Sequence, residues 1–223
     1  MRRPGVLADT TMDTRYKLYH FDAQGRGELI RLIFRFVGED YEDIRVHPTL
    51  WEQLKPSTPF QTLPVLEVGG KQIAQSMSIA RYLANEFDLG GRTVLERAMV
   101  DSAAEFVDEL LSDTLKIIYQ PNQKYRDHDT KKFLTSTLPV KLGYLDDFKT
   151  KHGQGYGYIF GNNLTYADLS AYSTFDQMVS GGLTDWDLLQ QFQYPAELRR
   201  RILDGEPRIT QYLRNRDQML GTV

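Results

Sequence analysis

The residues of this sequence that could do chemistry are few and widely spaced. Its four histidines, His20, His47, His128 and His152, lack metal-ligand spacing, so we expect no metal site. The chain has no cysteine, which excludes disulfides, zinc ribbons, iron–sulfur clusters and a cysteine nucleophile. It also lacks the GxSxG turn and the phosphate-binding P-loop motif. Composition and spacing alone therefore identify no nucleophile within the protein.

Ser76 is a candidate binding residue because of its position. It stands where a predicted hairpin passes into a helix, so its hydroxyl and the nearby backbone N–H groups point out of the helix start. A helix start of this kind favours an anion, because the N–H groups lack partners and the helix dipole is positive there. The alternative is that Ser76 only caps the helix.

The elements that must position these residues alternate in the first part of the chain. Hydrophobic periodicity and turn residues predict strand 15–22, helix 29–37, strand 41–46, a hairpin over 64–74 and helix 77–87. Gly38 is a natural end for the first helix, and Gly69-Gly70 suits the hairpin turn. These elements indicate a compact α/β unit.

The chain becomes helical after Gly90-Gly91. Thr93-Val-Leu-Glu96 is a capping box that opens a long helix, and a second long helix is predicted over 127–151. A short strand is expected over 156–160, before a second capping-box-like start at Thr165-Tyr-Ala-Asp168. The later part of the chain is thus expected to be all-α.

Length and charge limit the organisation of the protein and the partners it can have. A chain of 223 residues suits one large domain or two small ones, and we predict a flexible tail over 1–14, an α/β domain over 15–91 and a helical domain over 93–223. A net charge of −3 gives no general attraction to nucleic acid or anionic membrane. No segment approaches the roughly 20 apolar residues that span a bilayer, and residues 1–14 lack the apolar core of a secretory signal. A cytoplasmic location is the expectation.

The motifs, taken in order, resemble those of the cytosolic glutathione transferases, with the sigma class fitting best. They are YKLYHF at 16–21, GRGE at 25–28, Trp51 with Lys55, LPVL at 63–66, QSMSIARYL at 75–83 and GNNLTYAD at 161–168. The resemblance covers residues 15–216. It implies a thioredoxin-like N-terminal domain followed by a helical C-terminal domain, and a homodimer without a metal. The activity it implies is conjugation of the thiolate of glutathione, the co-substrate, to small hydrophobic electrophiles in detoxification.

The same resemblance implies which residues hold the carboxylates of glutathione. Ser76, with Gln75 beside it, would hold the γ-glutamyl carboxylate. Trp51 and Lys55 lie four residues apart on one face of a short helical turn, and they would reach the glycyl carboxylate through the indole N–H and the ammonium charge. Otherwise they are a packed tryptophan and a solvated lysine.

Four further positions are matched by the resemblance. Leu63-Pro64 falls where the family has a cis-proline, which exposes the backbone of Leu63 to the cysteinyl part of glutathione. Asp101 would reach across the dimer interface to the amino group of the ligand, and its alternative is an exposed helix charge. Arg26 would lie beside the active site, and its alternative is a structural salt bridge.

The sequence departs from the family at the catalytic position. The family's tyrosine immediately precedes a phenylalanine, but here His20 precedes Phe21, and the tyrosine is Tyr19. Successive strand residues point to opposite faces, so Tyr19 replaces the missing hydroxyl only if the strand slips or bulges. His20 is the better candidate, because an N–H can stabilise a thiolate and a neutral imidazole can accept the thiol proton.

Two functions from different classes follow. One is a glutathione transferase with His20 at the tyrosine position, including a sigma-type variant that isomerises prostaglandin H2. The other is a glutathione-binding structural protein with little turnover, like the crystallins related to this class.

Overall fold

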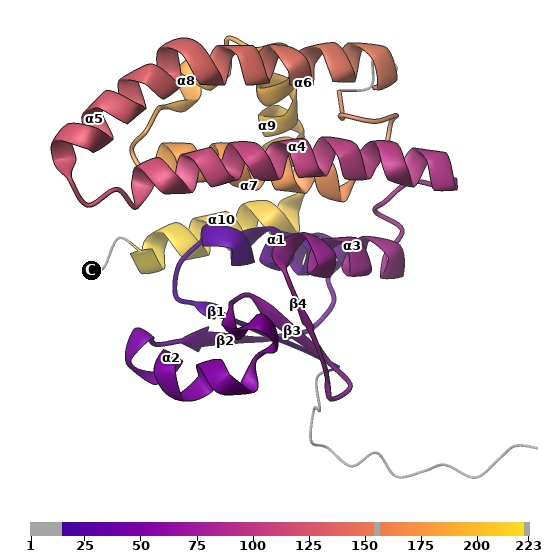
Figure 1. Cartoon of the computed structure of the whole chain (residues 1–223). Coiled ribbons are helices and arrows are strands. Elements are labelled where there is room, and N and C mark those ends of the chain that lie inside the picture. The colour runs from indigo at the N-terminus through magenta and orange to yellow at the C-terminus, as the bar shows by residue number, and fades with distance from the viewer. Residues whose placement is uncertain (1–14, 154–156, 221–223) are drawn as a thin grey trace, which may run out of the picture.

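The computed structural model describes residues 15–153 and 157–220, so the expected tail over residues 1–14 lies outside the described residues. The first part of the described chain is a four-stranded sheet with helices on both faces (Figure 1). Its elements are β1 Tyr16–Phe21, α1 Glu28–Val37, β2 Glu42–Val46, α2 Pro48–Leu54, β3 Val65–Val68, β4 Lys71–Ala74 and α3 Ser76–Glu86. Their order and pairing confirm the thioredoxin-like domain.

The sheet has the strand order β2-β1-β3-β4. Strand β1 is parallel to β2 and antiparallel to β3, and β3 is antiparallel to β4. Tyr16, Leu18 and His20 are the buried residues of β1, because α1 and α3 cover the face of the sheet toward which they point. Helix α2 lies on the opposite face (Figure 1).

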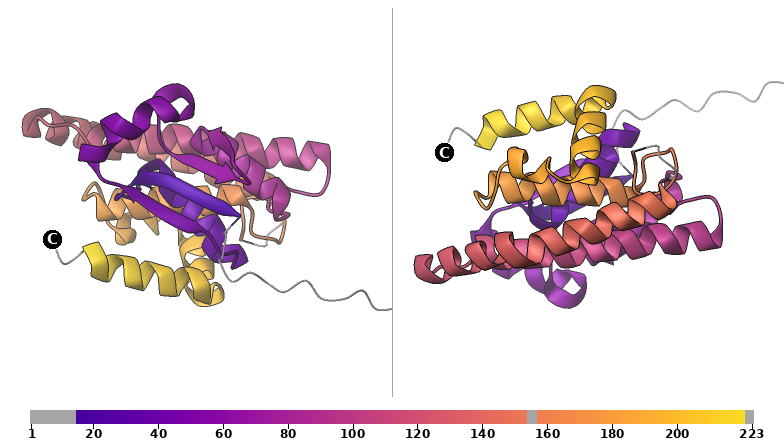
Figure 2. Two further views of the ribbon diagram at one scale, coloured as in Figure 1. Left: turned by 90° about the horizontal axis from the view of Figure 1, so that it is seen from below. Right: turned by 90° about the horizontal axis from the view of Figure 1, so that it is seen from above.

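The later part of the described chain is helical, with no strand beyond β4 in residues 75–153 and 157–220. Its helices are α4 Val94–Ile118, α5 Gln123–Lys132, α6 Leu138–His152, α7 Tyr166–Ser180, α8 Trp186–Leu189, α9 Gln193–Gly205 and α10 Pro207–Leu220. A π-helical turn, Phe133–Thr137, joins α5 and α6, and the joined helix runs beside α4 (Figures 1 and 2). Both predicted capping boxes are present, at the starts of α4 and α7. Among the described residues, none of the helices combines the length and the hydrophobicity of a transmembrane segment.

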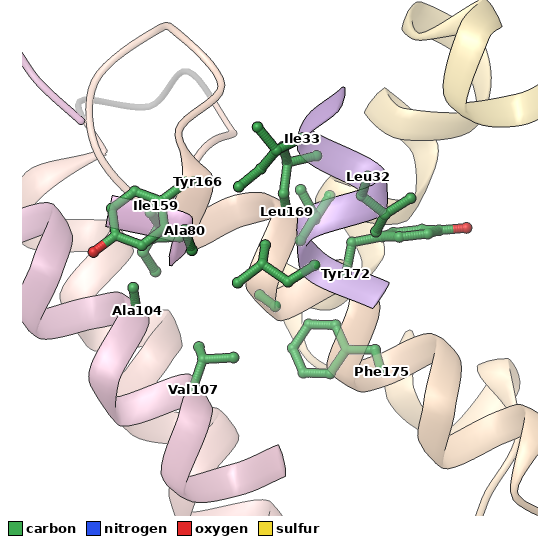
Figure 3. Packing of buried hydrophobic residues seen from close by; sticks show 14 of the residues in the cluster. Leu32, Ile33, Ala80, Ala104, Val107, Ile159, Tyr166, Leu169, Tyr172 and Phe175 are labelled. Atoms are coloured by element: carbon green, nitrogen blue, oxygen red, sulfur yellow. The ribbon is translucent and has the colours of Figure 1, made fainter. Parts of the chain in front are cut away.

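The main hydrophobic core lies where α7 packs between α4 and α1. Figure 3 shows Leu169 and Phe175 of α7 directed into a cluster that includes Ile33 of α1 and Val107 of α4. All four side chains are buried, and burial of each large apolar side chain contributes about 1.5–3 kcal/mol to stability. The sheet domain and the helical domain therefore share one continuous core.

Two expected elements need correction. The second long helix begins at Gln123 instead of residue 127, because the Asn122 side chain accepts a hydrogen bond from the backbone N–H of Tyr125 at 3.2 Å and caps the helix earlier. The short strand expected over 156–160 is wrong: residues 157–160 form bends, and residue 156 lies outside the described residues. Within the described residues no strand lies beside this segment to pair with it, and Ile159 is buried in the hydrophobic core instead.

Candidate functional site

One end of the sheet brings together three segments that are distant in sequence. The β1–β3 ladder ends at the pair Tyr19 and Val65, and Val65 pairs on its other side with Ala74. The residues that follow Tyr19, precede Val65 and follow Ala74 therefore meet beyond the ladder. These are His20, the Leu63-Pro64 segment and the Gln75-Ser76 segment, so the register alone gathers five of the expected site residues.

Helix α3 starts at this end with backbone N–H groups available for an anion. Ser76 is its first residue and is buried, with 8% of its surface exposed, while Gln75 occupies the N-cap position and makes no side-chain cap. The expectation that Ser76 caps the helix is therefore wrong, because Gln75 occupies the N-cap position and Ser76 is the first helical residue. Gln75 has φ 73°, a region that non-glycine residues rarely occupy, and such outliers cluster at ligand-binding positions.

Trp51 and Lys55 approach the same end from the α2 side. The indole of Trp51 packs edge-on against Phe21 with ring centroids 5.6 Å apart, which ties α2 to the end of β1. Lys55 begins the 3₁₀ turn that follows α2. Within the described residues, neither the indole N–H nor the ammonium has a hydrogen-bond or ion-pair partner. Both groups are available to a ligand.

The Leu63–Pro64 peptide bond is cis. Pro64 is buried and Leu63 is half-buried. Because the β1–β3 ladder ends at Val65, the backbone of Leu63 lies beyond the ladder, where its carbonyl and N–H groups are not used by the sheet.

The His20 imidazole is enclosed by protein. Only 6% of the residue is exposed, and Nδ1 lies 3.1 Å from the backbone oxygen of Phe21. Burial, together with the nearby positive charge of Arg31, lowers the pKa of His20 to about 4. At neutral pH the imidazole is therefore uncharged.

Tyr19 lies on the opposite face of β1 from His20. The strand pairs without interruption with β2 from Lys17 to Phe21, so the strand neither slips nor bulges at this position. Burial and the nearby Glu67 raise the pKa of Tyr19, which favours the protonated phenol. The tyrosine is thus directed away from the face that carries His20.

Arg26 and Asp101 both have partners within the chain. The Arg26 guanidinium forms an ion pair with Asp108 and donates a hydrogen bond to the Ser112 hydroxyl at 2.7 Å, both residues being on α4. This is the structural salt bridge that was the alternative for Arg26. The Asp101 carboxylate accepts a hydrogen bond from Arg81 Nε at 2.9 Å and another from the Tyr166 hydroxyl of α7.

The residues that hold the turn after β1 were not found from the sequence. Gln177 Nε2 donates to the backbone oxygen of Gly25 at 3.2 Å, and Ser180 donates to the Gln24 side chain at 3.2 Å, both from α7. They lie more than 150 positions away in sequence, and no motif marks them. A group of three or more potential metal-binding side chains does not occur in the described part of the chain.

Comparisons with known proteins agree with this geometry. Residues 14–85 match the family model described as glutathione S-transferase, N-terminal domain, and residues 108–216 match glutathione S-transferase, C-terminal domain. Glutathione S-transferase 4 of Caenorhabditis elegans is 35% identical over 179 residues, which cover 77% of this chain and 84% of that protein. S-crystallin SL11 of Nototodarus sloanii is 28% identical over a region that covers 91% of this chain and 97% of that protein. The solved structure of rat hPGDS complexed with a quinoline aligns with a TM-score of 0.77 and 32% sequence identity. The alignment covers 90% of this chain and 96% of that chain.

Proposed function

Because the chain belongs to the glutathione S-transferase family, we propose that it binds glutathione at the His20 end of the sheet and conjugates the glutathione sulfur to small hydrophobic electrophiles. The observation that carries this proposal is the meeting, at one sheet end, of a helix start, the end of β1 and two donors, the Trp51 indole and the Lys55 ammonium, that have no partner in the described part of the chain. Glutathione has two carboxylates and one thiol, and this arrangement supplies complementary groups for each.

Each part of the tripeptide has a proposed partner. The start of α3, with Ser76 and Gln75, binds the γ-glutamyl carboxylate through N–H groups and the helix dipole. Trp51 and Lys55 bind the glycyl carboxylate. The backbone of Leu63 pairs with the cysteinyl residue, which directs the sulfur toward His20.

Calorimetric titration with glutathione tests the binding site. A hydrogen bond to a charged group contributes about 1.5–3 kcal/mol, so Ser76→Ala should weaken binding by about 10- to 100-fold. Ser136→Ala is the matched control, because Ser136 is exposed on the π-helical turn, and it should bind as the wild type does. Absence of glutathione binding by the wild type would contradict the proposal.

A second function is favoured by the buried, neutral His20. A neutral imidazole stabilises a thiolate less than a correctly placed donor does, so the chain could retain glutathione with little turnover. That behaviour would match a structural role, and the similarity to an S-crystallin supports it as the second candidate.

Steady-state conjugation of a chloronitrobenzene separates the two functions. Since one lost donor costs about 10²–10³ in rate, His20→Tyr should raise kcat by up to about 10²-fold if the wild type lacks thiolate stabilisation. Tyr19→Phe should change activity little, because Tyr19 lies on the other face. If His20→Tyr gives no gain and His20→Ala no loss, position 20 does not act on the thiol.

The finer assignments complete this proposal. The motif order and the similarity to rat hPGDS support the sigma class, and prostaglandin H2 is a candidate second substrate on the same grounds. A cytoplasmic location and a role in detoxification follow from the family resemblance.

We also propose a homodimer, in which Asp101 of each subunit faces the ligand of the other. Phe60 supports it, because this aromatic side chain is 77% exposed and has φ 55° on the turn Pro59–Gln61. An apolar hollow of about 260 Å³ on the outer side of the α4 and α6 helices offers a place for such a side chain. We call it the α4–α6 hollow; its lining residues are Ser102, Ala103, Phe106, Tyr144, Leu145 and Phe148.

A further inference from the structure

The turn after β1 forms a close-fitting seat for the His20 imidazole. A Cβ atom placed on Gly27 would lie 2.7 Å from Cγ and 2.8 Å from Nδ1 of His20, and one on Gly25 would lie 3.2 Å from Cε1. Gly27 has φ −81° and ψ −20°, which any residue adopts readily. The absence of a side chain at position 27 therefore provides space for the imidazole and is not required by the backbone.

The Phe21 carbonyl decides which imidazole nitrogen carries the hydrogen. A carbonyl oxygen only accepts, so Nδ1 at 3.1 Å must donate. A neutral imidazole has one N–H and one lone pair, which leaves the lone pair on Nε2. Nε2 has no hydrogen-bond partner within residues 15–153 and 157–216. The free nitrogen of His20 is thus an acceptor.

The charges around the ring keep it neutral. Burial and Arg31 of α1 are the main causes of the lowered pKa of His20, and Arg45 of β2 acts in the same direction. The hydrogen bond to the Phe21 carbonyl and, more weakly, Asp43 of β2 raise the pKa of His20, but burial and Arg31 outweigh them. An imidazolium that could donate from both nitrogens is therefore disfavoured near neutral pH.

We propose that Gly27 is a positioning residue which seats His20 with Nδ1–H on the Phe21 carbonyl, so that Nε2 accepts the S–H of glutathione and the site binds the protonated thiol. This inference rests on the proposed glutathione site. A hydroxyl or N–H donor at the same place would stabilise the thiolate, whereas an acceptor stabilises the thiol. The chain therefore has a glutathione site of reversed hydrogen-bond polarity at the sulfur.

Nitrogen-15 NMR of the histidine rings in the free protein tests the seat. Wild-type His20 should give the Nδ1–H tautomer at pH 7. Gly27→Ala forces the ring from the Phe21 carbonyl, so its spectrum should shift toward the Nε2–H form. Gly143→Ala is the control, because a Cβ there meets nothing within 4 Å, and its spectrum should not change. An Nε2–H tautomer in the wild type, or an unchanged spectrum in Gly27→Ala, would overturn the proposal.

A double-mutant cycle keeps the test informative if Gly27→Ala is unstable. Overpacking against the ring should lower the Tm of Gly27→Ala by roughly 5 °C. In a His20→Ala background the ring is gone, so adding Gly27→Ala should change the Tm little. An equal loss in both backgrounds would show that Gly27 does not act through His20.

Ultraviolet titration of the thiolate in the glutathione complex tests the polarity at the sulfur. The bound thiol of the wild type should titrate at or above the free-thiol pKa of about 8.5, and His20→Tyr should lower this bound pKa by a unit or more. A wild-type complex that holds the thiolate at pH 7 would overturn the reversed polarity. If the wild type does not bind glutathione, the proposed function is contradicted instead. The NMR result on the free protein would then still show whether Gly27 positions the His20 ring.

Discussion

The His20 side chain makes the stability of the protein depend on pH. Its pKa is about 4 in the folded chain, against about 6.5 for an exposed histidine. Between these values the unfolded chain binds more protons than the folded one, so the free energy of unfolding rises with pH in this window. The stabilisation is fully present above about pH 6.5 and is lost as the pH falls toward 4.

We predict that the wild type loses about 2 kcal/mol more unfolding free energy between pH 7 and pH 5 than His20→Asn does. The substitution removes the titrating imidazole. The comparison therefore uses the change in unfolding free energy with pH in each protein, and not the absolute stability of the variant. Urea unfolding at both pH values gives the difference. His128→Asn removes an exposed histidine on α5 and should keep the wild-type slope. Equal slopes in His20→Asn and the wild type would contradict a neutral, buried His20.

The residue types of the site were open to prediction, but their hydrogen-bonding was not. A histidine before Phe21 is visible in the sequence as a departure from the tyrosine pattern. Whether its free nitrogen donates or accepts depends on the Phe21 carbonyl and on the space above Gly27. Both features depend on the folded geometry of the turn, and no motif in the sequence predicts them.

Elements with capping residues could be predicted closely from the sequence. Gly38 ends α1 in the left-handed conformation with φ 74°, and Thr93 with Glu96 starts α4 through a reciprocal capping box. Helix α2 had a signal as well, since Pro48 occupies its first turn and the His47 side chain accepts from Thr49 N. The sequence indicates only a short helical turn at Trp51 and Lys55, because prolines follow at positions 56 and 59.

The π-helical turn between α5 and α6 has an identifiable cause. Pro139 has no N–H to donate, and its ring would clash with the carbonyl of Thr135 in a regular α-helix. The wider turn over Phe133–Thr137 avoids this contact, and the backbone N–H of Leu138 bonds to the Phe133 oxygen instead. The helical periodicity predicts one continuous helix through this position, but it does not reveal the π-helical turn that Pro139 requires.

At the scale of the whole molecule, the helical domain holds the seat of His20. Gln177 of α7 bonds to the backbone of Gly25, and Asp108 of α4 pairs with Arg26, so the turn that encloses the imidazole is held from two helices. The continuous core between α1 and α7 fixes the distance between the two domains. The proposed polarity at the glutathione sulfur therefore depends on contacts between the domains as well as on β1.

The proposed homodimer depends on whether Phe60 enters the α4–α6 hollow of a second copy. A two-fold dimer repeats such a contact twice. Burying one phenylalanine contributes about 2 kcal/mol, so Phe60→Ser should raise the dimer dissociation constant by about a thousandfold over both sites. Sedimentation velocity across a concentration series measures it.

Tyr125→Ser is the matched control for this measurement. Tyr125 is also an exposed aromatic, at 60%, but it lies on α5 and outside the hollow, so its dimer should dissociate as the wild type does. Ser102→Phe fills the hollow from within and should weaken the dimer as Phe60→Ser does. A Phe60→Ser dimer of wild-type affinity would place the interface elsewhere. A wild type that stays monomeric at all concentrations would contradict the homodimer, and Asp101 would then keep only its partners within the chain.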